Sequence, residues 1–522
     1  MQPLSQLLPH HLPILTAFLL LFLLPQLTSA QCLITRRGLS HDLLLTGTIL
    51  TNDGAQRNSV IFIQAGKLTH VGDACGLGTR GLTASVIACG PRSVISPGFI
   101  NTHEHIDYAT VRPFAGIGLN SDSWSLHRHD WRLGARNALL HRPVAINGSA
   151  SDAAAWGELR HVFSATTAIV GGAMSPGLAR NLDFSSGLEE GLRGPPAVYE
   201  TFPLRDKHGT LRLGDCDYGP EAVTADNVRL YKRYIAHVGE GVDAHAANEF
   251  ACLSNLTFDT DPAPLGGGLS TDVILPNVAL VHALALTERD FELVAARGTK
   301  IVWSPRSNVA LYGATLNASA LLAAGVDVAL GTDWLPSGSA TMAREAACAK
   351  AVLKSRFGVE VKAKTLWDMA TRTAALVAGF EDQLGALEVG MCADVAVFAA
   401  APARDNDEKE RSRMEPKEKE DGDGNVGADD NYDDDHLFAQ AIFAPQERVE
   451  LVLRGGKILL ASTELGDLTS DSCEQVVFGK TAKKIVCVAD ELGFPFAELR
   501  ARLQGMYPAI LPDIPPDEPP CE

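Results

Sequence analysis

The chain has 522 residues, of which 46% are hydrophobic and 21% are charged. This composition is typical of a soluble globular protein, and it excludes wholesale disorder, a collagen-like repeat and a multi-span membrane protein. The 45 basic and 63 acidic residues give a formal charge of −18; because a negative surface repels phosphate backbones, nucleic acid is not an expected partner.

The first thirty residues have the pattern of a secretory signal peptide. Residues 14–24 are apolar except for Thr16, and the small residues Thr28, Ser29 and Ala30 precede Gln31, which predicts cleavage after Ala30. The apolar run is shorter than the roughly 20 residues that span a bilayer. We therefore expect a secreted, extracellular chain with no stable membrane insertion, although the leader lacks Lys and Arg. Three glycosylation sequons, which begin at Asn147, Asn255 and Asn317, fit this expectation.

The region after the leader predicts an α/β protein. Residues 41–72 read as short strands separated by turns such as Asn52-Asp53-Gly54. From Ser96 to about Gly379, apolar strand-like runs alternate with helix-like stretches, and that length suits a (β/α)₈ TIM barrel with insertions. Residues 393–398 and 449–454 again look like strands. We therefore predict a flanking β-sandwich domain built from both ends of the chain.

An acidic segment interrupts the second half of this β-sandwich. Residues 404–435 contain 14 acidic and 6 basic residues. Such a segment has too little apolar surface to offset the entropy that it would lose on folding, so we predict a solvated, disordered insertion. The proline-rich end of the chain is expected to be extended at most. The predicted boundaries are 1–30 for the signal peptide, 31–95 for the first part of the sandwich and 96–384 for the barrel. The second part of the sandwich is predicted at 385–403 and 437–465, the insertion at 404–436 and a C-terminal tail at 466–522.

The strongest chemical signal is the sequence His103-Glu104-His105 after the apolar run that contains Phe99 and Ile100. Alternate side chains of a strand share a face, so both imidazoles point the same way and Glu104 points opposite. Two imidazoles at a strand end form half of a zinc or iron site. A chance pair in a chain with 15 histidines is the alternative.

Three further strand ends carry residues of the same kind. The run from Tyr234 to Val238 contains His237 and is followed by Glu240, Val278 to Val281 leads into His282, and Val326 to Leu330 leads into Asp333. In a barrel these ends open onto one face, where active sites lie. Singly, His282 and Asp333 could equally be hydrogen-bonded structural groups.

The order His-x-His, His-x-x-Glu, His, Asp resembles the amidohydrolase superfamily of metal-dependent (β/α)₈ hydrolases. Among its branches, the cytosine and adenosine deaminase type and the aminotriazine hydrolases are the most similar. The resemblance implies His103, His105, His237 and Asp333 as metal ligands, Glu240 as the proton shuttle and His282 as the group that orients the attacking hydroxide. The stretch Glu158-Leu159-Arg160-His161 and residues 385–394 resemble the family as well.

One departure from the family bears on the number of metal ions. Members with two ions usually carry a carboxylated lysine on the fourth strand, but residues 197–202 contain no lysine, and Lys207 lies beyond them. The sequence therefore favours one divalent ion, with zinc in first place and iron as the alternative.

The resemblance implies hydrolysis of a carbon–nitrogen bond other than a peptide bond in a small, heterocyclic substrate. A metal ion lowers the pKa of bound water toward roughly 7, which makes hydroxide available at neutral pH. Release of ammonia would make the protein a deaminase, and opening of a ring would make it a cyclic amidase. Trp334 could stack on a planar ring or simply pack. The loop from Trp124 to Trp131, with Arg128, His129 and Asp130, is either a substrate contact or a solvated surface loop.

A different class remains open: a secreted, non-catalytic protein that binds a metal or small molecule on an amidohydrolase scaffold. Neither a ligand nor the shuttle acid is lost, which disfavours it. The sequence allows a homo-oligomer without requiring one.

The spacing of the cysteines predicts two disulfides, Cys75–Cys89 and Cys473–Cys487, each closing a loop of about 15 residues. Cys252 and Cys348 lie on helix-like stretches and are expected to be buried thiols.

Overall fold

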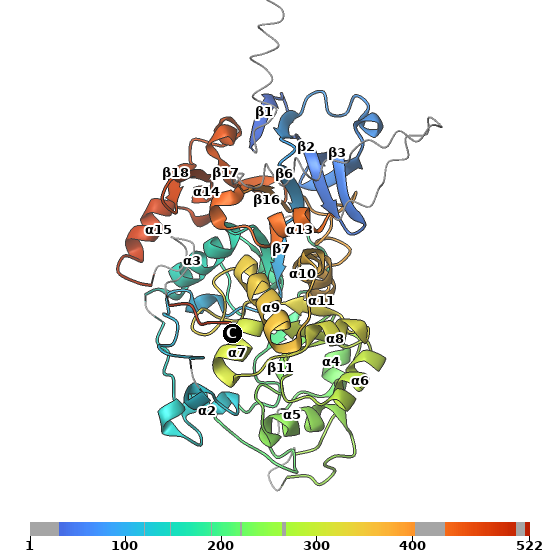
Figure 1. Ribbon diagram of the computed structural model, residues 1–522, viewed down its shortest axis with the longest axis vertical. Helices are drawn as coiled ribbons and strands as arrows, with labels where there is room; N and C mark the ends of the chain where they lie inside the picture. The colour runs from blue at the N-terminus through green and yellow to red at the C-terminus, as the bar shows by residue number, and fades with distance from the viewer. Residues whose placement is uncertain are drawn as a thin grey trace, which may run out of the picture.

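The computed structural model (Figure 1) describes residues 31–119, 121–146, 148–188, 191–219, 222–263, 268–401, 434–507 and 517–521. The predicted signal peptide lies outside the described residues, as does the acidic insertion up to Asp433.

Eight parallel strands in chain order form the centre of the molecule. They fall into a three-stranded and a five-stranded sheet: β7 (Phe99–Asn101), β8 (Thr166–Ile169), β9 (Arg180–Asn181), β10 (Val198–Glu200), β11 (Tyr234–Val238), β12 (Val278–His282), β13 (Lys300–Trp303) and β14 (Val328–Leu330). The backbone of Ala197 donates to Leu182 (2.9 Å), which links the sheets after β9, and that of Asp333 donates to His103 (2.9 Å) beyond β14 and β7. The strands therefore follow one another around a ring, as the alternating sequence predicts.

Seven of the eight barrel strands are buried along their whole length, and only β10 is partly exposed. Along β12, Ala279 and Val281 belong to one apolar cluster while Val278 and Leu280 belong to another. Because successive side chains of a strand point to opposite faces, this split assigns one set to the barrel interior and the other to the layer under the helices. It explains why these strands read as continuous apolar runs rather than alternating ones.

Helices connect the strands and cover the ring (Figure 1). They are α2 (Arg128–Leu133), α3 (Ala150–Val162), α4 (Ala225–Arg229), α5 (Ala244–Ser254), α6 (Glu288–Ala296), α7 (Pro305–Tyr312), α8 (Ala318–Ala323), α9 (Met342–Phe357), α10 (Ala363–Ala370) and α11 (Arg372–Ala378). Most of them begin at a side-chain cap; Thr341, for example, accepts a hydrogen bond from the backbone of Arg344 at the start of α9.

A second sheet of eleven strands contains strands from both chain ends. Its members are β1 (Cys32–Arg36), β2 (Leu43–Thr51), β3 (Gly54–Gln64), β4 (Lys67–Gly72), β5 (Ser85–Cys89), β6 (Ser93–Pro97), β15 (Val395–Ala399), β16 (Val449–Arg454), β17 (Lys457–Ser462), β18 (Glu474–Phe478) and β19 (Ala482–Val486). The two ends meet where β6 pairs with β15 in antiparallel register. The arrangement of this sheet as a sandwich stays a prediction.

The region after residue 465, expected to be a tail, contains regular structure. Strands β18 and β19 extend the eleven-stranded sheet, and α14 (Ala489–Leu492) and α15 (Phe496–Arg502) follow them. On α15, Phe496 and Leu499 are buried, so the segment contributes to the core.

The end of the acidic segment is also part of the fold. Helix α13 (Asp435–Ile442) begins there. Asp434 accepts a hydrogen bond from Arg57 (2.6 Å), and Asp435 accepts from the backbone of Ala363 (3.0 Å) and Lys364 (2.9 Å). The predicted insertion therefore extends too far by these last residues.

The disulfide prediction was correct for Cys473–Cys487 and wrong for Cys75–Cys89. Cys89 is bonded to Cys32, its direct partner in the register of β5 against β1, and Cys75 is an exposed thiol. Cys252 and Cys348 are not thiols either, because Cys252 is bonded to Cys216 and Cys348 to Cys521. Spacing along the chain did not reveal these pairs, since each joins segments that only the fold brings together.

In the described part of the chain, no helix is both long enough and apolar enough to cross a membrane.

Candidate metal centre

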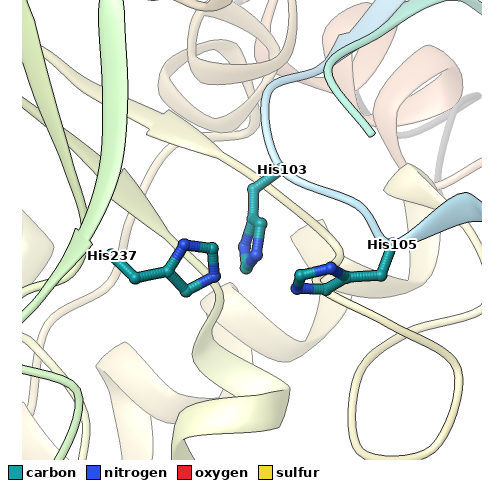
Figure 2. A group of neighbouring side chains, drawn as sticks. All are labelled: His103, His105 and His237. Atoms are coloured by element: carbon teal, nitrogen blue, oxygen red, sulfur yellow. The ribbon is translucent and has the colours of Figure 1, made fainter. Parts of the chain in front are cut away.

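The predicted residues come together at one end of the barrel. His237 lies in β11 and His282 ends β12, while His103 and His105 follow β7 and Asp333 follows β14. In Figure 2 the rings of His103, His105 and His237 point toward one another. Parallel strands bring their carboxyl ends to one face, and this is the face where TIM barrels place their chemistry.

The three histidines are close enough to share an ion. One ring nitrogen from each of His103, His105 and His237 lies within 4.8 Å of the others. The Nε2 atoms of His103 and His105 are both 3.5 Å from Oδ1 of Asp333. Three imidazoles and one carboxylate oxygen thus surround a single point, as in a catalytic zinc site.

Hydrogen bonds fix which ring nitrogen of His237 and of His103 faces that point. Nδ1 of His237 lies 3.4 Å from the backbone oxygen of Glu200; because a carbonyl oxygen only accepts, Nδ1 donates and Nε2 keeps its lone pair. Nδ1 of His103 bonds Oγ of Ser304 at 3.1 Å. Its Nε2 is buried and has no hydrogen-bond partner within the described residues. A buried acceptor of this kind fits a metal ligand whose other ring nitrogen is anchored.

Two of the site residues have unusual backbone conformations. His282 has φ of 66° and Asp333 has φ of 61°, in the left-handed region that favours glycine. Such conformations cost on the order of 1–3 kcal/mol and cluster at functional sites. They turn both side chains inward at the ends of their strands.

Glu240 and His282 lie beside the ligand group. Tyr312 donates a hydrogen bond from its hydroxyl to Oε1 of Glu240 at 2.6 Å. Nδ1 of His282 donates to Oδ1 of Asn308 at 2.9 Å. Nε2 of His282 is 3.9 Å from Glu240 and 4.0 Å from Asp333, which places an imidazole between the two carboxylates.

Burial and mutual repulsion set the charges of these groups. Burial and then the neighbouring His237 hold the pKa of His103 well below its ordinary value, and burial lowers the pKa of His105 to about 4. Burial, followed by the charge of Glu240, raises the pKa of Asp333 well above its ordinary value. These imidazoles are therefore neutral at physiological pH and can each donate a lone pair to a metal ion. A cation beside Asp333 would stabilise the ionised form of this buried carboxylate, and a divalent metal ion would supply that charge.

Glu240 behaves differently from Asp333. Burial alone would raise the pKa of Glu240, but His282, Arg128 and the Tyr312 hydrogen bond together lower it below its ordinary value. Glu240 is therefore an ionised carboxylate at neutral pH and is able to accept a proton.

Glu104 points away from the centre, as the alternation predicts. Its carboxylate accepts hydrogen bonds from Arg160 (3.0 Å) and His161 (3.0 Å) on α3 and from the hydroxyl of Thr332. This network joins the His103–His105 segment to α3 and to the residue before Asp333. It explains the position of Arg160 and His161 within the Glu158–His161 motif: these two side chains support the strand ends from behind.

A cavity of about 320 Å³ opens onto the centre. Besides the site residues, its wall contains aromatic and cationic side chains: Tyr108, Trp131, Phe202, Trp334, Arg128, Arg132 and Arg142. The rings of Trp131 and Trp334 are 5.1 Å apart. The segment from Trp124 to Trp131 is not a solvated surface loop, because its second half forms the start of α2. Arg128, His129 and Asp130 are buried, and Arg128 pairs with Asp206 at 2.7 Å and Glu249 at 3.0 Å.

Sequence reasoning missed a set of supporting groups on and before α7. Ser304 contacts His103, Ser307 donates to Asp333 at 2.5 Å, Asn308 contacts His282 and Tyr312 contacts Glu240. The i, i+4 spacing of Ser304, Asn308 and Tyr312 places them on one helix face. The available signal was their position directly after a barrel strand, at the same end as His282.

Comparison with known proteins agrees with this geometry. Residues 94–459 match the model of the amidohydrolase family. A 5-methylthioadenosine/S-adenosylhomocysteine deaminase of Moorella thermoacetica is 26% identical over 353 residues, which cover 64% of this chain and 80% of the relative. A protein of the same name from Caldicellulosiruptor saccharolyticus is 23% identical over 377 residues, covering 69% and 85%.

Solved structures show the same fold. A triazine hydrolase from Arthrobacter aurescens superposes with a TM-score of 0.53 at 16% identity, covering 83% of this chain and 97% of the hydrolase. An atrazine chlorohydrolase of the same species, complexed with zinc, gives a TM-score of 0.50 at 17% identity and covers 81% and 96%.

Proposed function

The chain belongs to the amidohydrolase family, and from this we propose that it is a metal-dependent hydrolase that acts on carbon–nitrogen bonds other than peptide bonds. The observation that carries the proposal is the meeting of His103, His105, His237 and Asp333 around one point, with Glu240 and His282 beside it. The rival idea of a non-catalytic binding protein gains no support, because every residue needed for the chemistry is present.

We propose one ion, held by His103, His105, His237 and Asp333, with zinc as the first choice. The donor set of nitrogen and oxygen atoms suits zinc. Strand β10 supplies no lysine for a second ion; Tyr199 stands on it instead, and its hydroxyl lies 3.4 Å from Nε2 of His105. When bound, the ion acts as a Lewis acid that lowers the pKa of water.

Two residues of the protein, His282 and Glu240, would then orient the attacking water and transfer its proton. Nδ1 of His282 donates its proton in a hydrogen bond to Asn308, so Nε2 keeps its lone pair and can accept a hydrogen bond from the attacking water and orient it. Glu240 is ionised and can take the proton of that water. It would then pass the proton to the leaving nitrogen, as a general acid–base group does.

The cavity favours a small, flat substrate. About 320 Å³ lies at the lower end of the range for small-molecule sites, and Trp131 and Trp334 offer ring faces to a planar heterocycle. The relatives are named as deaminases of adenosine derivatives. We therefore propose deamination of an amino-substituted heterocycle, with hydrolysis of a cyclic amide as the alternative reaction at the same site.

The test combines metal analysis with turnover. The purified protein should contain about one zinc or iron per chain and should hydrolyse a member of a panel of nucleosides, aminotriazines and cyclic amides. A chelator should abolish that activity and added metal should restore it. A metal-free protein, or turnover that a chelator leaves unchanged, would contradict the proposal.

We also propose that the protein is secreted after cleavage before Gln31. Four disulfides fit an oxidising compartment. N-terminal sequencing of protein collected from the medium should begin at or near Gln31, whereas an intact Met1 on intracellular protein would refute this.

A further inference from the structure

The end of the chain packs against two helices of the barrel, α7 and α9. In Figure 1 the red C-terminal trace lies beside α7 and α9. Cys521 is bonded to Cys348 on α9, and Pro519 is buried. We call residues 517–521 the strap.

The strap holds α7 through one arginine. Arg306, in the first turn of α7, donates from its guanidinium to the backbone oxygen of Pro519 and lies 3.6 Å from the carboxylate of Glu518. Both side chains are nearly inaccessible, with exposed fractions of 7% for Arg306 and 3% for Glu518. A buried charge pair of this kind is costly to break, because removal of one partner leaves the other uncompensated.

Glu518 also fixes the loop that follows Asp333. Its carboxylate accepts from the backbone of Ala340 at 3.0 Å and pairs with Arg344 on α9. Arg306 in turn donates to Oγ of Ser339 at 2.6 Å. The strap therefore joins α7, α9 and the loop between Asp333 and α9 at one buried point.

The same helix holds the chemical groups. Ser307, Asn308 and Tyr312 of α7 contact Asp333, His282 and Glu240, respectively. A helix is a rigid body over eight residues, so a shift at Arg306 moves these three contacts together. We propose that the strap positions α7 for catalysis and that Glu518 is a positioning residue of the active site. This inference rests on the proposed hydrolase function.

The strap is expected to act on kcat rather than on substrate binding. As defined by the described residues, the cavity wall includes neither Arg306 nor any strap residue, so loss of Glu518 removes no substrate contact. It would loosen the geometry of Glu240 and His282, and small misplacements of catalytic groups reduce rates strongly. Glu518→Gln should lower kcat about tenfold or more and leave KM and metal content within about threefold.

A double-mutant cycle separates positioning from general destabilisation. If Glu518 acts through the Tyr312–Glu240 contact, Glu518→Gln should have a much smaller effect on kcat in a Tyr312→Phe background than in wild type. Independent effects would multiply instead. Measurements are made well below the unfolding temperature of each variant.

Removal of two different disulfides provides a further test of the strap and its matched control. Cys348→Ser/Cys521→Ser should lower kcat as Glu518→Gln does, whereas Cys473→Ser/Cys487→Ser, which removes the disulfide next to β18 and β19, should not. Unchanged kcat in Glu518→Gln, or fully multiplicative effects in the cycle, would overturn the role of the strap.

Hydrogen exchange tests the strap without turnover. Glu518→Gln should speed exchange of the α7 amides relative to those of β12; equal protection in variant and wild type would overturn the inference. Absence of turnover in the wild type would count against the proposed function alone, and the exchange result would still decide the role of the strap.

Discussion

The hydroxyl of Tyr312 donates a hydrogen bond of 2.6 Å to the carboxylate of Glu240, although the two residues are 72 positions apart in the sequence. This contact joins the helix after β13 to the turn after β11. It also stabilises the ionised form of Glu240, which is the form that accepts a proton.

Tyr312→Phe should therefore change the pH dependence of the reaction. The hydrogen bond helps to hold the pKa of Glu240 below its ordinary value, so its loss raises that pKa. Because Glu240 must start ionised, the acid limb of the kcat/KM profile should move to higher pH. Turnover at neutral pH should fall about tenfold, the scale of a hydrogen bond to a charged group. An unchanged acid limb would show that another group controls it.

Glu104→Gln should destabilise the fold. Glu104 is the buried partner of Arg160 and His161, and removal of its charge leaves the Arg160 guanidinium uncompensated. We expect the free energy of unfolding to fall by about 3–5 kcal/mol, measured by denaturant titration. Glu360→Gln, which removes the partner of Lys354 in an exposed ion pair, is the control and should leave the midpoint in place. Equal midpoints for both variants would refute the bracing role of Glu104.

Two deletions distinguish the acidic insertion from the fold that follows it. Removal of residues 404–433 with a short flexible linker should preserve folding and activity, because that composition cannot build a core. Removal of residues 404–435 should lower the unfolding temperature. It takes away the acceptors for Arg57 and for the first backbone amides of α10. If the shorter deletion also unfolds the protein, the insertion is structural.

Thiol labelling checks the disulfide pattern. Cys75 is exposed and Cys392 is buried, so an alkylating reagent should modify only Cys75 in the native protein and both after unfolding without reductant. Peptide mapping should recover Cys32 with Cys89. A bridge between Cys75 and Cys89 would contradict the structure.

The positions of the proposed metal ligands and of His282 could be predicted from sequence, and the groups behind them could not. His103, His105, His237, His282 and Asp333 stand at the ends of apolar runs, and parallel strands bring such ends to one face. Ser307, Asn308 and Tyr312 belong to residue types that carry no distinctive signal in a sequence, and their role depends on the direction in which α7 leaves the barrel. The pairing of Cys32 with Cys89 depends similarly on strand register, which local spacing does not encode.

We propose that His237 binds the metal and that Glu240, three residues further along at the end of β11, transfers the proton. His237→Ala removes a proposed ligand and should empty or weaken the metal site. Glu240→Gln keeps the shape of the side chain but cannot shuttle a proton. The most direct test measures metal content and kcat together in Glu240→Gln. We expect full metal occupancy with turnover lowered roughly 10²–10⁴-fold; loss of the metal, or near-normal turnover, would show that Glu240 has a different role.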